Sequence, residues 1–173
     1  KIMDVIFDID GTLLDISHRL KFIKQTPKDW KSFRDPKQKQ WDEPRLEIIR
    51  IATALQDAGH QLIFASGRTE SERSDTIISL RSWFLLDGWT DIEPYNIMVW
   101  DDAVMNDVST SPFYMRKNND YRADTIVKGE MFDQMLADGY EPTMVFDDRP
   151  SVIRMWRELG SLTVIDVGHG IEF

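Results

Sequence analysis

The sequence predicts an α/β protein in which a five-stranded parallel sheet is covered by helices on both faces. Short apolar segments recur along the chain, and helical patterns lie between them. The apolar segments do not alternate with polar residues, which is typical of strands buried on both faces. The five predicted strands are Met3–Asp8, Gln61–Ala65, Ile97–Trp100, Thr143–Asp147 and Leu162–Ile165.

Residues that begin and end helices mark four predicted helices between these strands. The first begins at Asp42-Glu43-Pro44, with Pro44 near the first helical position, and ends at Gly59. Thr69 and Glu72 have the spacing of a capping box, which predicts a second helix reaching about Leu86. The other two are predicted from Asp124 to Gly139 and from Pro150 to Gly160.

Two segments depart from this alternation. Residues 15–42 are basic and aromatic, and they predict two short helices inserted after the first strand as a small cap. Residues 101–123 are polar and predict a long loop after the third strand, and such loops are often functional. The 173 residues therefore predict a single domain, 1–173, with a small insertion.

The composition excludes several kinds of chemistry. The sequence contains no cysteine, so disulfides, zinc–thiolate sites, iron–sulfur clusters and a cysteine nucleophile are ruled out. No apolar run approaches the length that spans a membrane, and the N-terminal residues do not resemble a signal peptide. We therefore expect a cytoplasmic protein without a membrane partner.

The charge is distributed unevenly. The net charge is −9, from 30 acidic and 21 basic residues, which argues against a general nucleic-acid coat protein. Residues 15–45 nevertheless contain nine Lys/Arg against five Asp/Glu, a local net charge of +4. This excess indicates either an anionic partner that meets one face or an ordinary solvated segment.

Polar residues gather where the predicted strands end. Asp8, Asp10, Gly11 and Thr12 follow the first strand, and Ser66-Gly67-Arg68 follow the second. Lys128 lies in the first turn of a helix, and Asp147-Asp148-Arg149 end the fourth strand. These ends converge at one edge of a parallel sheet, where several carboxylates would repel one another. An all-oxygen set of this kind favours Mg²⁺ over Ca²⁺ or Mn²⁺.

The spacing of the first two acids suits phosphate chemistry. Asp8 and Asp10 are two residues apart on an extended segment, so both lie on one side of it. One carboxylate can attack phosphorus while the other transfers protons. Each motif alone has an ordinary explanation, such as a turn or a helix cap. Only their combination, in this order and at these strand ends, is specific.

The four motifs resemble those of the haloacid dehalogenase superfamily of aspartate-nucleophile phosphatases. The resemblance implies a three-layer Rossmann-like sandwich, with Asp8 as the nucleophile and Asp10 as the general acid/base that also offers a backbone carbonyl to the metal. It implies Mg²⁺ as the cofactor, with Asp8, Asp10, Asp147 and Asp148 around it and Asp148 favoured as a direct ligand. The candidate phosphate- or substrate-binding residues are Gly11, Thr12, Ser66, Gly67, Arg68, Arg116, Lys128 and Arg149.

The C-terminal segment narrows the resemblance. Residues 147–160, DDRPSVIRMWRELG, are similar to the DDRxxVxxMWRxxG segment of phage polynucleotide kinase–phosphatases. That resemblance implies a phosphatase acting on the 3′-phosphate of a nucleic acid end or nucleotide. The sequence has no GK[ST] kinase loop, so kinase activity is not predicted.

Some alternatives stay open at the level of sequence. A 5′-nucleotidase or small-metabolite phosphatase would use the same motifs, and a non-catalytic module that binds phosphorylated ends is a third possibility. Arg149 is expected either to pair with one of the two preceding acids or to contact the substrate. Arg19 is expected either to reach the substrate, with His18, or to pair with an acid at the rim of the site. At least half of the aromatic residues Phe22, Trp30, Phe33 and Trp41 are expected to fasten the insertion to the body.

Overall fold

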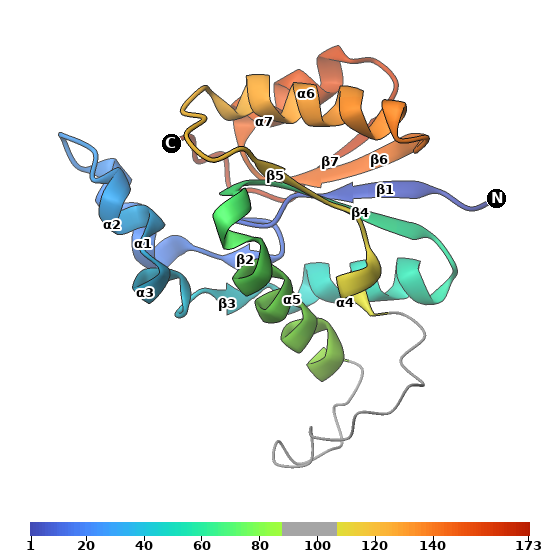
Figure 1. The fold of residues 1–173 in the computed structure, drawn as a ribbon, viewed down its shortest axis with the longest axis horizontal. Helices are drawn as coiled ribbons and strands as arrows, with labels where there is room; N and C mark the ends of the chain where they lie inside the picture. Colours follow the sequence, from blue (N-terminus) through green and yellow to red (C-terminus); the bar gives the residue numbers. More distant parts are fainter. Residues whose placement is uncertain (88–106) are drawn as a thin grey trace.

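The computed structural model describes residues 1–87 and 107–173. Within these residues the centre is a five-stranded parallel sheet in the order β5-β4-β1-β6-β7, with helices on both faces (Figure 1). The predicted fold class is therefore confirmed. The strands are β1 (Asp4–Phe7), β4 (Gln61–Thr69), β5 (Phe113–Arg116), β6 (Pro142–Asp147) and β7 (Thr163–Asp166).

Helices lie on both faces of the sheet (Figure 1), and the sheet separates two hydrophobic clusters. Helices α4 (Leu46–Asp57) and α5 (Arg73–Asp87) cover one face, and α6 (Asp124–Ala137) and α7 (Pro150–Glu158) cover the other. Phe7 of β1 packs with the first cluster and Ile6 with the second, because successive side chains of a strand point to opposite faces. Both faces of β1 are therefore dry, which explains its uninterrupted apolar sequence.

Residues 15–42, which we call the insertion, lie beyond the carboxyl ends of the strands (Figure 1). The sequence predicted two short helices there, whereas the structure has three: α1 (Ser17–Lys24), α2 (Trp30–Arg34) and α3 (Pro36–Lys39). A two-stranded ribbon of β2 (Leu14–Asp15) and β3 (Glu43–Pro44) closes its base. The insertion has its own apolar cluster, formed by Ile16, Leu20, Ile23 and Phe33.

Two predicted boundaries are wrong. The first helix was expected to begin around Pro44, but Pro44 pairs with Leu14 in the ribbon and α4 begins at Leu46. The predicted loop over 101–123 contains η3 (Val108–Thr110) and strand β5 within its described part. Strand β5 has only four residues and ends in an arginine, so its sequence lacks the apolar run by which the other strands were found. The predicted strand Ile97–Trp100 lies outside the described residues.

The capping box is confirmed. The Thr69 backbone N–H donates to a Glu72 carboxylate oxygen at 2.9 Å, and the short helix η1 (Glu70–Glu72) leads into α5. Pro150 is at the start of α7 as expected, whereas Asp124 is the first residue of α6 and Ala123 its cap. Among the residues that the structure describes, no helix combines the length and the apolar character needed to cross a membrane.

Candidate active site

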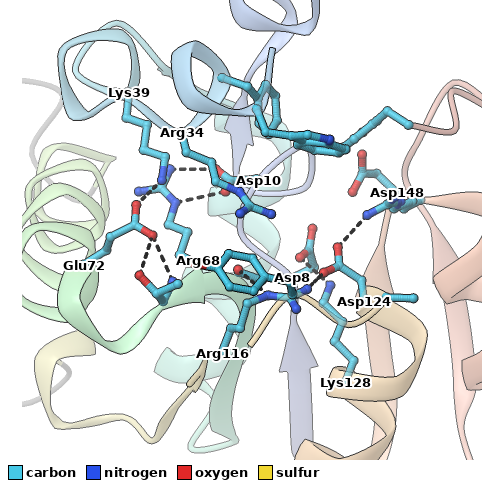
Figure 2. Close-up of a pocket in the computed structure, with 18 of the residues that line it drawn as sticks. Asp8, Asp10, Arg34, Lys39, Arg68, Glu72, Arg116, Asp124, Lys128 and Asp148 are labelled. Carbon is cyan, nitrogen blue, oxygen red and sulfur yellow. Dashed lines mark hydrogen bonds and ion pairs between the residues drawn. The ribbon is translucent and has the colours of Figure 1, made fainter. Parts of the chain in front are cut away.

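A cavity of about 430 Å³ opens at the carboxyl edge of the sheet (Figure 2). Strand β1 leads into its floor, and β4, β5 and β6 contribute residues beside it. The insertion contributes one wall through residues of α1, α2 and α3. The cavity therefore lies where the strand-end motifs were predicted to converge.

Asp8 and Lys128 meet at the floor of this cavity. The Lys128 ammonium lies 2.6 Å from Oδ1 of Asp8 and 2.9 Å from Oδ2 of Asp147. Burial raises the pKa of Asp8, and the carboxylates of Asp147 and Asp148 raise it further against the opposing effect of Lys128. Burial alone would lower the pKa of Lys128, but Asp147 and Asp8 hold it above its usual value. The ammonium is thus held charged beside the predicted nucleophile.

Three carboxylates form a cluster that can hold a cation. Asp8, Asp147 and Asp148 each offer an oxygen, and these oxygens lie within 4.8 Å of one another. Burial and the nearby Asp147 raise the pKa of Asp148 to about 6. Three crowded oxygen donors with so little positive charge fit a hard divalent cation such as Mg²⁺. The Asp10 side chain lies outside this cluster, and the participation of its backbone carbonyl stays a prediction.

Gly11 and Thr12 shape the wall beside these carboxylates. Gly11 has a φ of +88°, and an added Cβ would lie 2.0 Å from a carboxylate oxygen of Asp148. Only glycine fits both the backbone angle and the space. The Thr12 hydroxyl donates to Oδ2 of Asp8 at 2.9 Å, so it orients the candidate nucleophile.

Asp10 is surrounded by positive charge, whereas Asp8 lies among carboxylates. The Asp10 carboxylate accepts hydrogen bonds from Arg68 at 2.9 and 2.6 Å and from Arg19 at 2.8 Å. Burial alone would raise the pKa of Asp10, but the two arginines hold it well below its usual range. Asp42 completes the group by accepting from both guanidinium groups. Of the two expectations for Arg19, the structure therefore shows the pairing with acids. Nε2 of His18 lies 2.8 Å from Oδ1 of Asp42.

The second predicted motif, Ser66-Gly67-Arg68, lies near the end of β4, beside the cavity. The Ser66 hydroxyl is buried and accepts a hydrogen bond from the Arg68 backbone N–H at 3.1 Å. Gly67 lines the cavity, and an added Cβ there would lie 3.0 Å from an Asp124 oxygen. The Arg68 guanidinium is committed to Asp10 and Asp42 in this structure. Direct contact of these residues with a phosphate stays a prediction.

Arg116 and Arg149 line the cavity and share one partner. Both guanidinium groups bind the carboxylate of Asp124, and the distance from Arg149 is 2.6 Å. Arg149 also pairs with Glu172 at 2.7 Å. The expectation that Arg149 neutralises one of the two preceding acids is wrong, because only its backbone N–H reaches Asp147, at 3.2 Å.

Several residues of the site are not marked as such by the sequence, and Asp42, Asp124, Glu72 and Trp156 are examples. The sequence marks Asp42 only as part of a helix start, although it is buried against two arginines. The sequence marks Asp124 only as the start of a helix and Glu72 only as part of a capping box, yet both line the cavity. Trp156 is part of the C-terminal segment that resembles the phosphatase family, and its indole N–H donates to Oδ2 of Asp147 at 3.0 Å. No local pattern marks these contacts, because each joins segments that are distant in the sequence.

The aromatic residues of the insertion differ in their surroundings. Phe33 is buried in the insertion's apolar cluster and contacts Phe173 with a ring-centroid distance of 5.9 Å. Phe22 packs against the same cluster, whereas Trp41 is 68 % exposed. Trp30 lines the cavity. Two of the four residues therefore serve packing within the insertion.

A parallel sheet with this acidic edge and a lysine beside its central aspartate is the architecture of haloacid dehalogenase-type phosphatases, the class that the motifs resemble. A family model described as "Polynucleotide kinase PNKP phosphatase domain" matches residues 3–171. The chain therefore belongs to the family of PNKP phosphatase domains.

A viral relative agrees with this assignment. The chain is 30 % identical over 127 residues to a protein of Autographa californica nuclear polyhedrosis virus named "Putative bifunctional polynucleotide kinase/RNA ligase". The match covers 73 % of this chain and 15 % of the viral protein, so the chain corresponds to a small part of that relative.

Solved structures share the fold. A chain of the Pnkp1/Rnl/Hen1 RNA repair complex has a TM-score of 0.62 and 24 % identity, covering 98 % of this chain and 43 % of that one. A crystal structure named "Putative Phosphatase from Clostridium difficile" has a TM-score of 0.58 and 14 % identity, covering 99 % of this chain and 88 % of that one. At these identities the structures support the fold alone.

Proposed function

We propose that this phosphatase domain removes the 3′-phosphate from nucleic acid ends, with Asp8 as the nucleophile and Mg²⁺ as the cofactor. The observation that carries the proposal is the floor of the cavity, where Lys128 lies 2.6 Å from Asp8 beside Asp147 and Asp148. Family membership supports the choice of a polynucleotide substrate. We treat residues 1–173 as one domain whose insertion acts as a small cap.

The first step transfers the phosphoryl group to the protein. A carboxylate oxygen of Asp8 attacks phosphorus, the ester P–O bond breaks, and an aspartyl phosphate forms. Lys128 offsets negative charge at this point, and backbone N–H groups near Gly11 and Gly67 are candidates to do the same. Bound Mg²⁺ would supply further charge neutralisation from the cluster of Asp8, Asp147 and Asp148. The leaving oxygen takes a proton from Asp10.

The second step regenerates Asp8. Asp10 accepts a proton from a water molecule, whose oxygen attacks phosphorus, and the bond between Asp8 and phosphorus breaks to release phosphate. The arginine pair around Asp10 favours the ionised carboxylate, which is the form that can accept a proton. The acid role in the first step requires Asp10 to move away from Arg19 and Arg68.

Phosphate release from a panel of substrates tests the proposal. The panel contains a 3′-phosphorylated oligonucleotide, nucleoside 3′-monophosphates and nucleoside 5′-monophosphates, each with Mg²⁺. We expect the oligonucleotide to be preferred, and Asp8→Asn to lower turnover by roughly 1,000-fold or more. Asp133→Asn is the matched control, because it removes the same charge from an exposed position of α6.

Other outcomes would assign a different function. Preference for 5′-monophosphates would keep the mechanism and indicate a nucleotidase. Absence of turnover on every substrate, with binding of the phosphorylated end unchanged in Asp8→Asn, would indicate a binding module. The buried pair of Asp8 and Lys128 argues against that module, since a binder gains nothing from a carboxylate facing its anionic ligand.

A further inference from the structure

Eight arginine and lysine residues line the cavity, and they differ in whether a carboxylate of the protein pairs with them. At the floor, Arg19 and Arg68 pair with Asp10, and Lys128 pairs with Asp8. Toward the rim the pairs are Lys39 with Glu72, Arg122 with Asp120, and both Arg116 and Arg149 with Asp124. Seven of the eight cations are therefore balanced by a carboxylate of the protein.

Arg34 is the exception. It is the last residue of α2, it is exposed, and its side chain lines the cavity (Figure 2). Within residues 1–87 and 107–173 it forms no ion pair with a carboxylate. Its guanidinium carbon instead lies 5.3 Å from the ring centroid of Trp30, which itself packs edge-on against Phe33. An aromatic face orients a guanidinium without neutralising it, so Arg34 presents a held, unbalanced positive charge to the cavity.

We propose that Arg34 binds the phosphodiester next to the terminal nucleotide of a nucleic acid substrate. This inference rests on the proposed function and specifies how the same site would select its substrate. The phosphate to be removed has its own cation, Lys128, at the floor. A nucleoside monophosphate brings no other anionic group, whereas a nucleic acid strand brings a phosphodiester for every further nucleotide.

The location of Arg34 suits this contact. The insertion forms one wall of the cavity, and Arg34 extends from it toward the cavity in Figure 2, on the opposite side from Lys128. A guanidinium is the side chain best matched to phosphate oxygens because it donates two parallel hydrogen bonds. Arg34 would thus be the specificity-determining residue through which the insertion distinguishes a strand end from a mononucleotide.

A minimal pair of substrates isolates the contact. A 3′-phosphorylated dinucleotide has one phosphodiester more than a nucleoside 3′-monophosphate. A methylphosphonate version of the dinucleotide replaces the charged oxygen of that linkage by a methyl group and so removes its charge. We expect wild-type protein to prefer the charged dinucleotide over the methylphosphonate by about tenfold in kcat/KM, mainly through KM. Arg34→Gln should reduce this preference to less than about twofold.

Lys31→Gln is the matched control. Lys31 lies on the same short helix, is exposed, and is not among the residues that line the cavity. The variant loses the same charge, so a nonspecific effect of net charge would appear in both variants. With a longer oligonucleotide, Arg34→Gln should also make the salt dependence of log KM less steep by about one, and Lys31→Gln should not.

Each outcome decides a different part of the proposal. An unchanged preference in Arg34→Gln, or an equal loss in Lys31→Gln, would overturn the role of Arg34 while leaving the proposed function intact. If wild-type protein hydrolyses mononucleotides but neither dinucleotide, both the proposed substrate and the role of Arg34 are wrong. Equal hydrolysis of the two dinucleotides by wild-type protein would show that no residue reads the phosphodiester charge.

Discussion

Asp8 and Asp10 are two residues apart, yet the protein places them in opposite electrostatic surroundings. Asp8 faces the carboxylates of Asp147 and Asp148 with one lysine between them, and its pKa is raised by burial and by these neighbours. Asp10 faces Arg19 and Arg68, which hold its pKa low. Burial acts in the same direction on both, so the neighbouring charges decide the difference.

This contrast divides the site into an acidic side and an arginine side. The acidic side carries excess negative charge and is suited to a cation. The arginine side is balanced within the protein and joins the insertion to the sheet through Arg19, Asp42 and Arg68. Acids with divergent pKa values in one site indicate separate roles.

The largest effect on stability is expected when the ion pairs of Asp42 with Arg19 and Arg68 are removed. Asp42→Ala removes the carboxylate that accepts from Arg19 at 2.8 and 2.7 Å and from Arg68 at 3.1 Å. Two guanidinium groups would then share one remaining carboxylate, and we expect a loss of about 3 kcal/mol in the free energy of unfolding. Urea denaturation measures it, with Asp133→Ala as the exposed control. A loss below about 1 kcal/mol would show that the arginine side does not hold the insertion.

A second substitution tests whether the arginines control Asp10. Arg68→Gln removes the largest lowering effect on the pKa of Asp10, so that pKa should rise. The ionised base would then be lost at a higher pH, and the acidic limb of the kcat profile should move upward, with turnover reduced by about 100-fold. Arg68→Lys retains the charge and should give a smaller shift. An unchanged pH profile would separate Arg68 from proton transfer.

The acidic side could be predicted from the sequence much better than the arginine side. Asp8 and Asp147 each follow an apolar strand, and the parallel topology alone brings such ends together. Arg19 and Asp42 lie within an insertion that has no period to fix its geometry, so their pairing could not be foreseen. Strand β5 was missed for a related reason, because it is a short edge strand with a charged end.

A third prediction concerns the acidic side. The pKa of Asp148 is about 6, above the usual value near 4, so its folded form binds a proton more tightly than its unfolded form. The ionised carboxylate therefore costs stability. This cost is small below about pH 4, grows as pH rises from about 4 to about 6, and is constant above that. Without Mg²⁺, Asp148→Asn should be more stable than wild type by about 1 to 2 kcal/mol at pH 7.5, and this difference should shrink to about a third near pH 4.5.

With Mg²⁺ bound, wild-type protein should become more stable than Asp148→Asn at pH 7.5. A cation competes with protons for the same carboxylates, so it should raise the melting temperature of wild-type protein at pH 7.5 much more than at pH 4.5. Asp148→Asn should respond weakly at both values. Thermal denaturation with and without Mg²⁺ measures both effects. Equal stabilisation of the two proteins at pH 7.5 would place the cation outside the acidic cluster.

The smallest effect is expected from the hydrogen bond between Trp156 and Asp147 of the acidic side. The Trp156 indole donates to Asp147 at 3.0 Å, and its ring is fully buried against Phe132. Trp156→Phe keeps an aromatic ring but removes the donor, so Asp147 retains Lys128 and backbone N–H groups. We expect a loss of about 1 kcal/mol in stability and an increase of up to about tenfold in the Mg²⁺ concentration for half-maximal activity. Trp41→Phe, the same change at an exposed position, should alter neither, and an unchanged Mg²⁺ dependence in Trp156→Phe would assign Trp156 to packing alone.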